Sequence, residues 1–145
     1  MSVMKRTIKV VGAAIVDSGK ILVAQRPMSD KAYKSLKWEF PGGKIEYGET
    51  EEAAIRREIR EELDCEIEVD ILLPEIEYEY PDFILRMIIC ICHLVGATAP
   101  KCLEHNAVCW IPLDRLSDLD WAAADAQSYP IVADYLNLLL SAKLF

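Results

Sequence analysis

The sequence has few basic residues for its acidic content and no long hydrophobic run. Its 145 residues include 16 Lys and Arg against 24 Asp and Glu, which gives a net charge of −8. Binding of a nucleic-acid polymer requires a basic surface for the phosphates, so this balance argues against such a partner. It does not argue against a small phosphate ester, because a bound metal ion can supply positive charge locally.

Segments that would direct the chain into a membrane are also lacking. Residues 1–6 are polar and the pattern alternates from Thr7 onward, unlike the apolar core of a signal peptide. The apolar stretch near the C-terminus is interrupted by Asp134 and Asn137 and is too short to span a bilayer. We therefore expect a cytoplasmic protein without a membrane partner.

The cysteines lack the spacing of a zinc site. No C-x-x-C pair occurs and the number of cysteines is odd. They are Cys65, Cys90, Cys92, Cys102 and Cys109. We expect buried free thiols in a reducing compartment, not disulfides or zinc ligands.

No linker, repeat or low-complexity segment divides the chain. Apolar residues make up 52% and charged residues 28% of the sequence, which is ordinary for a soluble globular protein. A chain of 145 residues is long enough to bury a substantial core. We predict that residues 1–145 form a single domain, as a monomer or a homodimer.

The most informative stretch joins a glycine-rich loop to an acidic helix. Gly42, Gly43 and Gly48 are turn residues that adopt backbone angles other residues avoid. Thr50 is a good N-cap, and no helix breaker follows it until Asp64. The sequence therefore predicts a loop over 41–49 and a helix that ends near Asp64.

Two faces of this helix differ in character. Its core-facing residues recur every four positions, at Ile55, Ile59 and Leu63. Carboxylates at i, i+3 and i+4 lie on the adjoining face, at Glu58, Glu61 and Glu62. Such close carboxylates repel one another, and Arg57 alone cannot neutralise three of them. Hard oxygen ligands suit Mg²⁺ or Mn²⁺, whereas a solvated charged helix is the alternative for this spacing taken by itself.

Alternation and β-branched residues predict the remaining elements. Strands are expected at 7–16, 21–25, 38–40, 66–80 with a bulge around Pro74, 84–95 and 107–111. A turn at 17–20 joins the first two strands, and a short helical turn is expected at 112–116. An amphipathic helix begins at Tyr129 or Pro130. This order predicts an α/β fold in which helices cover both faces of a sheet, an α/β/α sandwich.

The loop and helix together resemble the signature of the Nudix hydrolases, G-x5-E-x7-R-E-U-x-E-E-x-G-U, where U is aliphatic. The matching residues are Gly43, Glu49, Arg57, Glu58, Ile59, Glu61 and Glu62. Asp64 replaces the glycine of the signature, and Cys65 stands at an aliphatic position. That glycine ends the helix in a left-handed conformation, which Asp tolerates better than most residues. The resemblance implies a Nudix-type α/β/α sandwich with a mixed β-sheet.

Other stretches resemble the MutT and CTP pyrophosphohydrolase branch of the family. They are Trp38 to Glu46, the pair Glu104-His105 followed by Trp110, and Ala124-Asp125. This resemblance implies metal-dependent hydrolysis of a nucleoside triphosphate, such as CTP, dCTP or a modified dNTP, to the monophosphate and pyrophosphate. Phe83 replaces the arginine that MutT-like proteins carry after the Pro-Asp turn, which weakens the case for an 8-oxoguanine substrate.

Two alternative functions remain open at this point. One is a Nudix hydrolase for another nucleoside diphosphate derivative, such as an ADP-sugar or a dinucleotide. The other is a noncatalytic nucleotide-binding domain, although every carboxylate of the signature is present.

The resemblance also assigns residues to the metal site. Glu58, Glu61 and Glu62 match the metal-binding carboxylates, and the Gly42 carbonyl matches an additional ligand. Glu104 corresponds to an acidic residue that serves as metal ligand or base, so either Glu58 or Glu104 activates the water. The structural residues of the signature are Gly43, Glu49 and Arg57, the last two as an ion pair that holds the loop against the helix.

Four residues are assigned to the substrate in the same way. Lys44 and Arg26 correspond to cations that meet the phosphate chain, and Phe40 to a residue beside the base. Asp125 corresponds to a polar residue that faces the base, where an ionised Asp would accept hydrogen bonds from cytosine or guanine donors. The structural alternatives are a surface role for Arg26, a core position for Phe40, and an N-cap or an exposed loop acid for Asp125.

Overall fold

The computed structural model describes residues 4–143, and its strands form one mixed sheet. β1 (Arg6–Asp17) and β7 (Phe83–Val95) pair in parallel at its centre, whereas the other pairings between the named strands are antiparallel. The remaining strands are β2 (Lys20–Gln25), β3 (Trp38–Glu39), β4 (Gly42–Lys44), β5 (Glu66–Leu72), β6 (Ile76–Glu79) and β8 (Ala107–Pro112). β4 pairs with β1, and β8 with β2.

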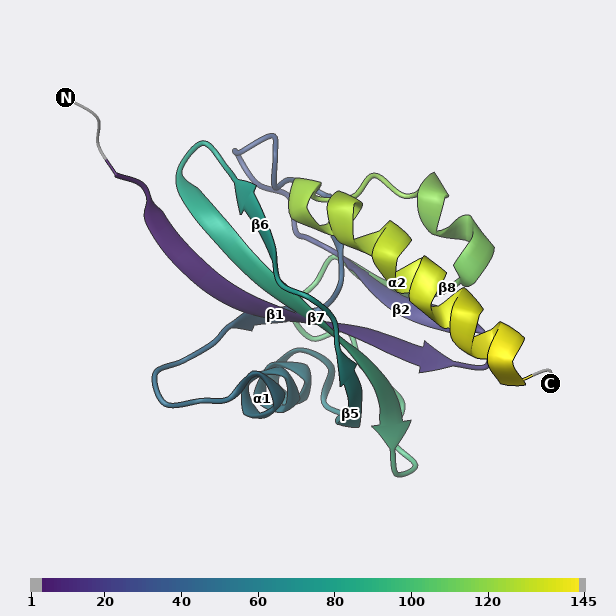
Figure 1. Cartoon of the computed structure of the whole chain (residues 1–145). Coiled ribbons are helices and arrows are strands. Elements are labelled where there is room, and N and C mark those ends of the chain that lie inside the picture. The colour runs from purple at the N-terminus through teal and green to yellow at the C-terminus, as the bar shows by residue number, and fades with distance from the viewer. Residues whose placement is uncertain (1–3, 144–145) are drawn as a thin grey trace.

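Two helices cover opposite faces of this sheet (Figure 1). α1 (Glu51–Leu63) packs on one face and α2 (Ala123–Lys143) on the other. A short 3₁₀ helix, η1 (Leu113–Asp118), follows β8 where a helical turn is expected. The predicted α/β/α sandwich with a mixed sheet is therefore confirmed.

The protein has two hydrophobic cores, one between the sheet and each helix, and alternating side chains of β1 contribute to both. Val11, Ala13 and Ile15 are buried with α1, whereas Ala14 is buried with α2. Successive side chains of a strand point to opposite faces, so a continuous apolar run supplies both layers. The predicted stripe of α1 contacts the first of these cores, and Ile55, Ile59 and Leu63 are fully buried.

The ends of α1 are formed as the sequence predicts. Thr50 Oγ1 accepts a hydrogen bond from the backbone N–H of Ala53 at 3.1 Å. Asp64 adopts the left-handed conformation, with φ 49° and ψ 45°, and its N–H donates to the Arg60 carbonyl at 3.1 Å. The aspartate thus takes the backbone conformation of the glycine in the family signature.

The expected single strand over 66–80 is wrong in detail, because the chain forms β5 and β6 with a break between them. Pro74 lies in this break, where it has no N–H to donate to a ladder. The bulge falls earlier than expected, between Val69 and Ile71. Both strands pair with β7, so the two halves still cover the same neighbour.

The start of the last helix also differs from the expectation. α2 begins at Ala123, and Pro130 lies inside the helix and not in its first turn. Ala122 N–H donates to the Trp38 carbonyl at 2.8 Å, which anchors the chain beside β3 directly before the helix. Tertiary packing of this alanine-rich first turn therefore outweighs the backbone hydrogen bond that Pro130 removes.

The cysteines are free thiols as expected, but burial holds for only part of the set. Cys65, Cys90 and Cys92 are buried, Cys109 is partly exposed and Cys102 is exposed. Within residues 4–143, no helix has the length and apolar character needed to cross a bilayer.

Candidate functional site

The glycine loop lies directly against β1 and α1. The Ala13 N–H donates to the Pro41 carbonyl at 2.8 Å. A Cβ on Gly42 would lie 2.0 Å from the Val11 carbonyl oxygen, so no larger residue fits there. A Cβ on Gly43 would lie 2.5 Å from the carboxyl carbon of Glu58. The two glycines therefore let the backbone approach β1 and leave space for an α1 carboxylate on the loop.

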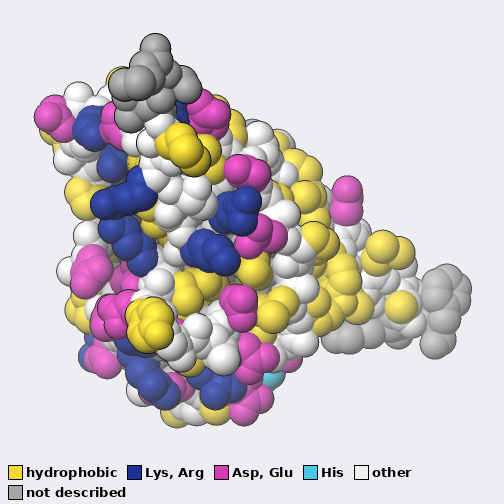
Figure 2. Space-filling model, turned by 60° about the vertical axis from the view of Figure 1, so that its left-hand side comes forward, with side chains coloured by type: hydrophobic (Ala, Val, Ile, Leu, Met, Phe, Trp, Pro, Cys, Tyr) yellow, Lys and Arg dark blue, Asp and Glu magenta, His cyan; other side chains and the backbone are white. Residues whose placement is uncertain are grey.

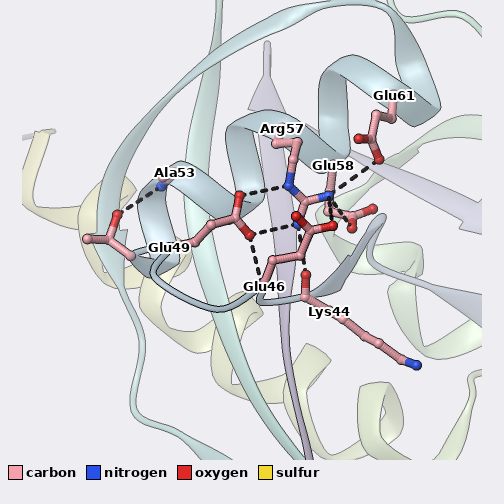
Figure 3. Close-up of polar contacts among 8 residues, drawn as sticks. Lys44, Glu46, Glu49, Ala53, Arg57, Glu58 and Glu61 are labelled. Carbon is pink, nitrogen blue, oxygen red and sulfur yellow. Dashed lines mark hydrogen bonds and ion pairs between the residues drawn. The ribbon is translucent and has the colours of Figure 1, made fainter.

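Arg57 fixes the loop to the helix through several carboxylates (Figure 3). Its Nε and Nη2 donate to the two oxygens of Glu49 at 2.7 and 2.9 Å, which is the expected ion pair. Nη2 also donates to the Lys44 carbonyl at 2.9 Å. The hydrogen bonds from Arg57, followed by the backbone N–H of Glu46, lower the pKa of Glu49 to about 2. This bidentate pair closes the loop that begins at Gly42.

The three signature carboxylates differ in their surroundings. Arg57 Nη1 donates to Glu58 at 2.9 Å and reaches Glu61 at 3.4 Å. Glu62 is 7% exposed and accepts a hydrogen bond from the Gly42 N–H at 3.2 Å. Burial, and then the charges of neighbouring carboxylates, raise the pKa of Glu62 to about 9. Burial also raises the pKa of Glu58, against the opposing effect of Arg57.

These carboxylates have the chemistry of a divalent cation site. In the part of the chain that the structure describes, no three His, Cys, Asp or Glu side chains converge as a metal-binding group. Arg57 instead pairs with Glu58 and Glu61, while Glu62 is bound to the loop backbone. A buried carboxylate beside like charges carries a desolvation penalty that a cation would relieve. Hard oxygen donors at the loop and helix therefore fit a hard divalent cation.

An open cavity of about 370 Å³ adjoins this helix face. It is lined by Arg26, Glu39, Glu62, Glu104 and His105, among other residues. Glu104 is exposed in the loop before β8, and its charge contributes to the raised pKa of both Glu58 and Glu62. The structure thus places Glu104 beside the signature carboxylates, although it lies some forty residues further along the chain.

A second cavity shares its Arg26 and Glu39 wall with the first. Its apolar and aromatic lining includes Tyr33, Phe40, Tyr80, Phe83, Leu85 and Met87. Gly42 and Gly43 line it on the loop side, and Asp125 belongs to its wall. Aromatic and apolar walls with a few polar groups are typical of a small-molecule pocket.

Asp125 is buried in the first turn of α2, so it is neither an exposed loop acid nor an N-cap. Its Oδ1 accepts a hydrogen bond from the Phe40 backbone N–H at 3.0 Å. Burial, and then the charge of Glu39, raise the pKa of Asp125 to about 8. This shift favours the protonated form over the ionised side chain expected from the sequence, and a protonated carboxyl group can donate as well as accept hydrogen bonds.

Of the other predicted substrate residues, Arg26 and Phe40 line these cavities and Lys44 lines neither. Arg26 lines both and donates from Nε to Glu39 Oε1 at 2.6 Å. Phe40 is buried, with its ring 5.1 Å from the Trp121 ring, so most of its side chain belongs to the core. Lys44 is exposed at the end of β4, and its side chain points away from the Arg57 network (Figure 3).

Sequence reasoning missed Glu39 and His105 as members of this site. Glu39 Oε1 accepts from Arg26, and Oε2 lies 3.0 Å from His105 Nε2. The His105 side chain is 6% exposed, and its Nδ1 is buried without a hydrogen-bond partner among residues 4–143. Glu39 therefore joins the two cavities. An acidic residue between Trp38 and Phe40 in a short strand was the available signal.

Comparisons with known proteins agree with this architecture. The family model described as NUDIX domain matches residues 6–132. A putative 8-oxo-dGTP diphosphatase 2 of Mycobacterium tuberculosis (strain CDC 1551 / Oshkosh) is 38% identical over 132 residues, covering 88% of this chain and 89% of its own. The CTP pyrophosphohydrolase of Escherichia coli (strain K12) is 35% identical over 127 residues, covering 83% and 87%.

A solved structure is similar over nearly the whole chain. It is the solution NMR structure of the DNA mismatch repair protein MutT (family Nudix hydrolase) from methicillin-resistant Staphylococcus aureus 252. It is 39% identical, has a TM-score of 0.70, and the match covers 91% of this chain and 99% of that one.

Proposed function

The chain belongs to the Nudix hydrolase family, and we propose that it hydrolyses nucleoside triphosphates, such as CTP, dCTP or a modified dNTP, to the monophosphate and pyrophosphate. The observation that carries this proposal is the junction of the two cavities at Arg26 and Glu39. One cavity has the aromatic walls and polar group of a base pocket, and the other is lined by Glu62 of the signature and by Glu104.

The carboxylate cavity accounts for the reacting end of the substrate. Glu58, Glu61, Glu62 and Glu104, with the Gly42 carbonyl, would hold Mg²⁺ or Mn²⁺. When bound, such a cation neutralises phosphate charge and lowers the pKa of a coordinated water. Gly42 N–H keeps the Glu62 carboxylate directed at the loop. Glu58 or Glu104 orients the attacking water as general base, because both lie beside this cavity or its carboxylates.

Basic residues position the phosphate chain between the cavities. Beyond the Nε bond to Glu39, the Arg26 guanidinium carries four further N–H donors on its two terminal nitrogens, and its planar group suits phosphate oxygens. Glu39 holds this guanidinium at the junction, so a triphosphate meets a fixed cation and not a mobile one. Lys44 supplies a second, exposed charge at the loop.

Asp125 forms hydrogen bonds with the base in the second cavity. One of its oxygens is occupied by the Phe40 N–H, which leaves the other free to carry the proton. A neutral carboxylic acid offers a donor and an acceptor together. This pair complements a base edge that also presents both, such as N3 and the N4 amino group of cytosine. The geometry therefore supports recognition of a base edge and not of phosphate alone.

A panel of nucleotides separates the proposal from its alternatives. We expect hydrolysis of CTP, dCTP or 8-oxo-dGTP at a kcat/KM at least about tenfold above ADP-ribose and diadenosine polyphosphates, since a single well-placed polar contact discriminates by about that factor. Glu62→Gln, assayed in parallel, reports any contaminating activity. Faster hydrolysis of the sugar or dinucleotide substrates would contradict the triphosphate assignment, and no hydrolysis of any substrate would favour a binding domain.

A further inference from the structure

A groove of about 430 Å³ opens beside the base pocket. Its floor is apolar and lies on the sheet, where Ile8 of β1 pairs with Leu85 of β7 and Arg6 pairs with Phe83. Loop residues Lys31 and Lys34 lie on its wall. The groove shares Arg26 and Gly43 with the base pocket, so the two are continuous.

Basic side chains are concentrated around this groove. Five line it, Arg6, Arg26, Lys31, Lys34 and Lys44, against one acidic residue, Asp82. In the view of Figure 2, several Lys and Arg side chains lie close together in the upper half, with Asp and Glu side chains among them. A local excess of positive charge over an apolar floor produces a strong attractive potential for anions.

Protein carboxylates balance part of the charge of this groove, because Arg26 pairs with Glu39 and Lys31 with Asp82. Asp82 already accepts bonds from Lys31 Nζ and from the Tyr33 hydroxyl, both at 2.5 Å. Arg6 and the Lys34 ammonium have no carboxylate partner among residues 4–143. Lys34 Nζ instead lies 5.8 Å from the centre of the Tyr33 ring, a cation–π contact that holds it at the groove.

We infer that the groove is a second anion subsite, which binds a phosphate group other than the one at the carboxylate cluster. The phosphate could arrive on a nucleotide, outside its 5′ phosphate chain, or as free pyrophosphate. Both sources carry the same chemistry, several negatively charged oxygens within a few ångströms of one another. Arg6, Lys31 and Lys44 line the groove but neither of the two cavities. Because Lys44 is already assigned to the phosphate chain, Arg6 and Lys31 are the residues that report on this subsite alone. The subsite adds to the proposed function and does not require catalysis.

Equilibrium binding in EDTA tests the inference without turnover. Without a divalent cation the carboxylate cluster repels anions, so any pyrophosphate that binds must use basic side chains. One arm titrates inorganic pyrophosphate by calorimetry, and the other compares a nucleoside 3′,5′-bisphosphate with its 5′-monophosphate. The proteins are the parent, the double variant Arg6→Gln/Lys31→Gln and, as the matched control, Lys9→Gln. Lys9 is an exposed lysine of β1 between the groove residues Ile8 and Val10, so its side chain lies on the other face of the strand.

We expect the double variant to bind at least one probe fivefold or more weakly than the parent, and Lys9→Gln to bind it like the parent. Weaker binding of pyrophosphate by the double variant identifies a free anion as the ligand. If instead the double variant no longer binds the bisphosphate more tightly than the monophosphate, the ligand is a phosphate carried by the nucleotide. Binding should also weaken as salt is added. Equal affinities in parent and double variant for every probe, or an equal loss in Lys9→Gln, would overturn the subsite. The nucleotide panel tests the proposed function separately, so the two can fail independently.

Discussion

Replacing Glu62 by Gln should remove turnover and at the same time stabilise the metal-free protein. The carboxylate is 7% exposed, and its pKa is raised to about 9 by burial and by the charges of Glu39, Glu58 and Glu104. Gln keeps an acceptor for the Gly42 N–H but carries no charge. It therefore removes the unfavourable ionisation and retains the hydrogen bond.

The size of the stabilisation depends on pH. The pKa of Glu62 is raised on folding, so its protonated form stabilises the fold fully below an ordinary pKa of about 4.5, and this contribution is lost as the pH rises towards 9. At pH 8.5 the upper limit of the penalty is about 5 kcal/mol, at about 1.4 kcal/mol per pKa unit. Glu62 borders an open cavity that admits water, so we expect about 2 kcal/mol.

Urea unfolding in EDTA at pH 5, 7 and 8.5 measures this effect, and hydrolysis at saturating Mg²⁺ measures turnover. We expect the free energy of unfolding of Glu62→Gln to exceed that of the parent increasingly with pH, and kcat to fall at least about 100-fold. Glu52→Gln, an exposed position on the same helix, is the control for loss of one negative charge. A variant that is less stable than the parent at pH 8.5, or that turns over like Glu52→Gln, would refute the reasoning.

Three further changes test separate parts of the site. Asp125→Asn replaces the carboxyl group by an amide that does not titrate. The ranking of bases by kcat/KM should therefore lose its pH dependence between pH 6 and 9. An unchanged pH profile would exclude Asp125 from base recognition. Gly43→Ala should lower kcat by about tenfold or more, because the added Cβ would displace the Glu58 carboxylate, and it should change the melting temperature little. Kinetics like those of the parent would show that the Glu58 side chain can move without loss of activity. Asp64→Gly should be neutral or stabilising by up to about 1 kcal/mol in thermal melts, since glycine adopts the left-handed conformation without strain. A clear loss of stability would assign a larger role to the exposed Asp64–Lys101 ion pair.

Local sequence patterns were sufficient to predict α1 and the glycine loop before it. The Thr50 cap, the stripe of α1 and the left-handed Asp64 depend on neighbours within a few residues, and all three are confirmed. The Glu49–Arg57 ion pair could be predicted because the spacing of the signature fixes both ends of one loop. The cap, the stripe and the end of the helix are local in sequence, so periodicity and capping rules predict them, whereas the ion pair was implied by the resemblance to the family signature.

Features that depend on distant contacts were not accessible in the same way. The last helix was expected to start at Tyr129 or Pro130, but it begins at Ala123, six or seven residues earlier, directly after the hydrogen bond between Ala122 and Trp38. The role of Glu39 at the junction depends on Arg26 and on a histidine sixty-six residues away. Likewise, burial in the folded protein, and then the charge of Glu39, raise the pKa of Asp125. In each case tertiary packing determines a property that the local sequence leaves open.

Identification of the products is the measurement that tests the central claim most directly. Incubation of CTP, dCTP and 8-oxo-dGTP with the parent protein and Mg²⁺, followed by ion-exchange chromatography, separates the monophosphate and pyrophosphate from the diphosphate and orthophosphate. We predict nucleoside monophosphate and pyrophosphate in equal amounts, with no product in EDTA or from Glu62→Gln. Formation of diphosphate and orthophosphate, or equal rates with and without a divalent cation, would contradict the assignment of the loop and carboxylate cluster as a metal-dependent pyrophosphohydrolase site.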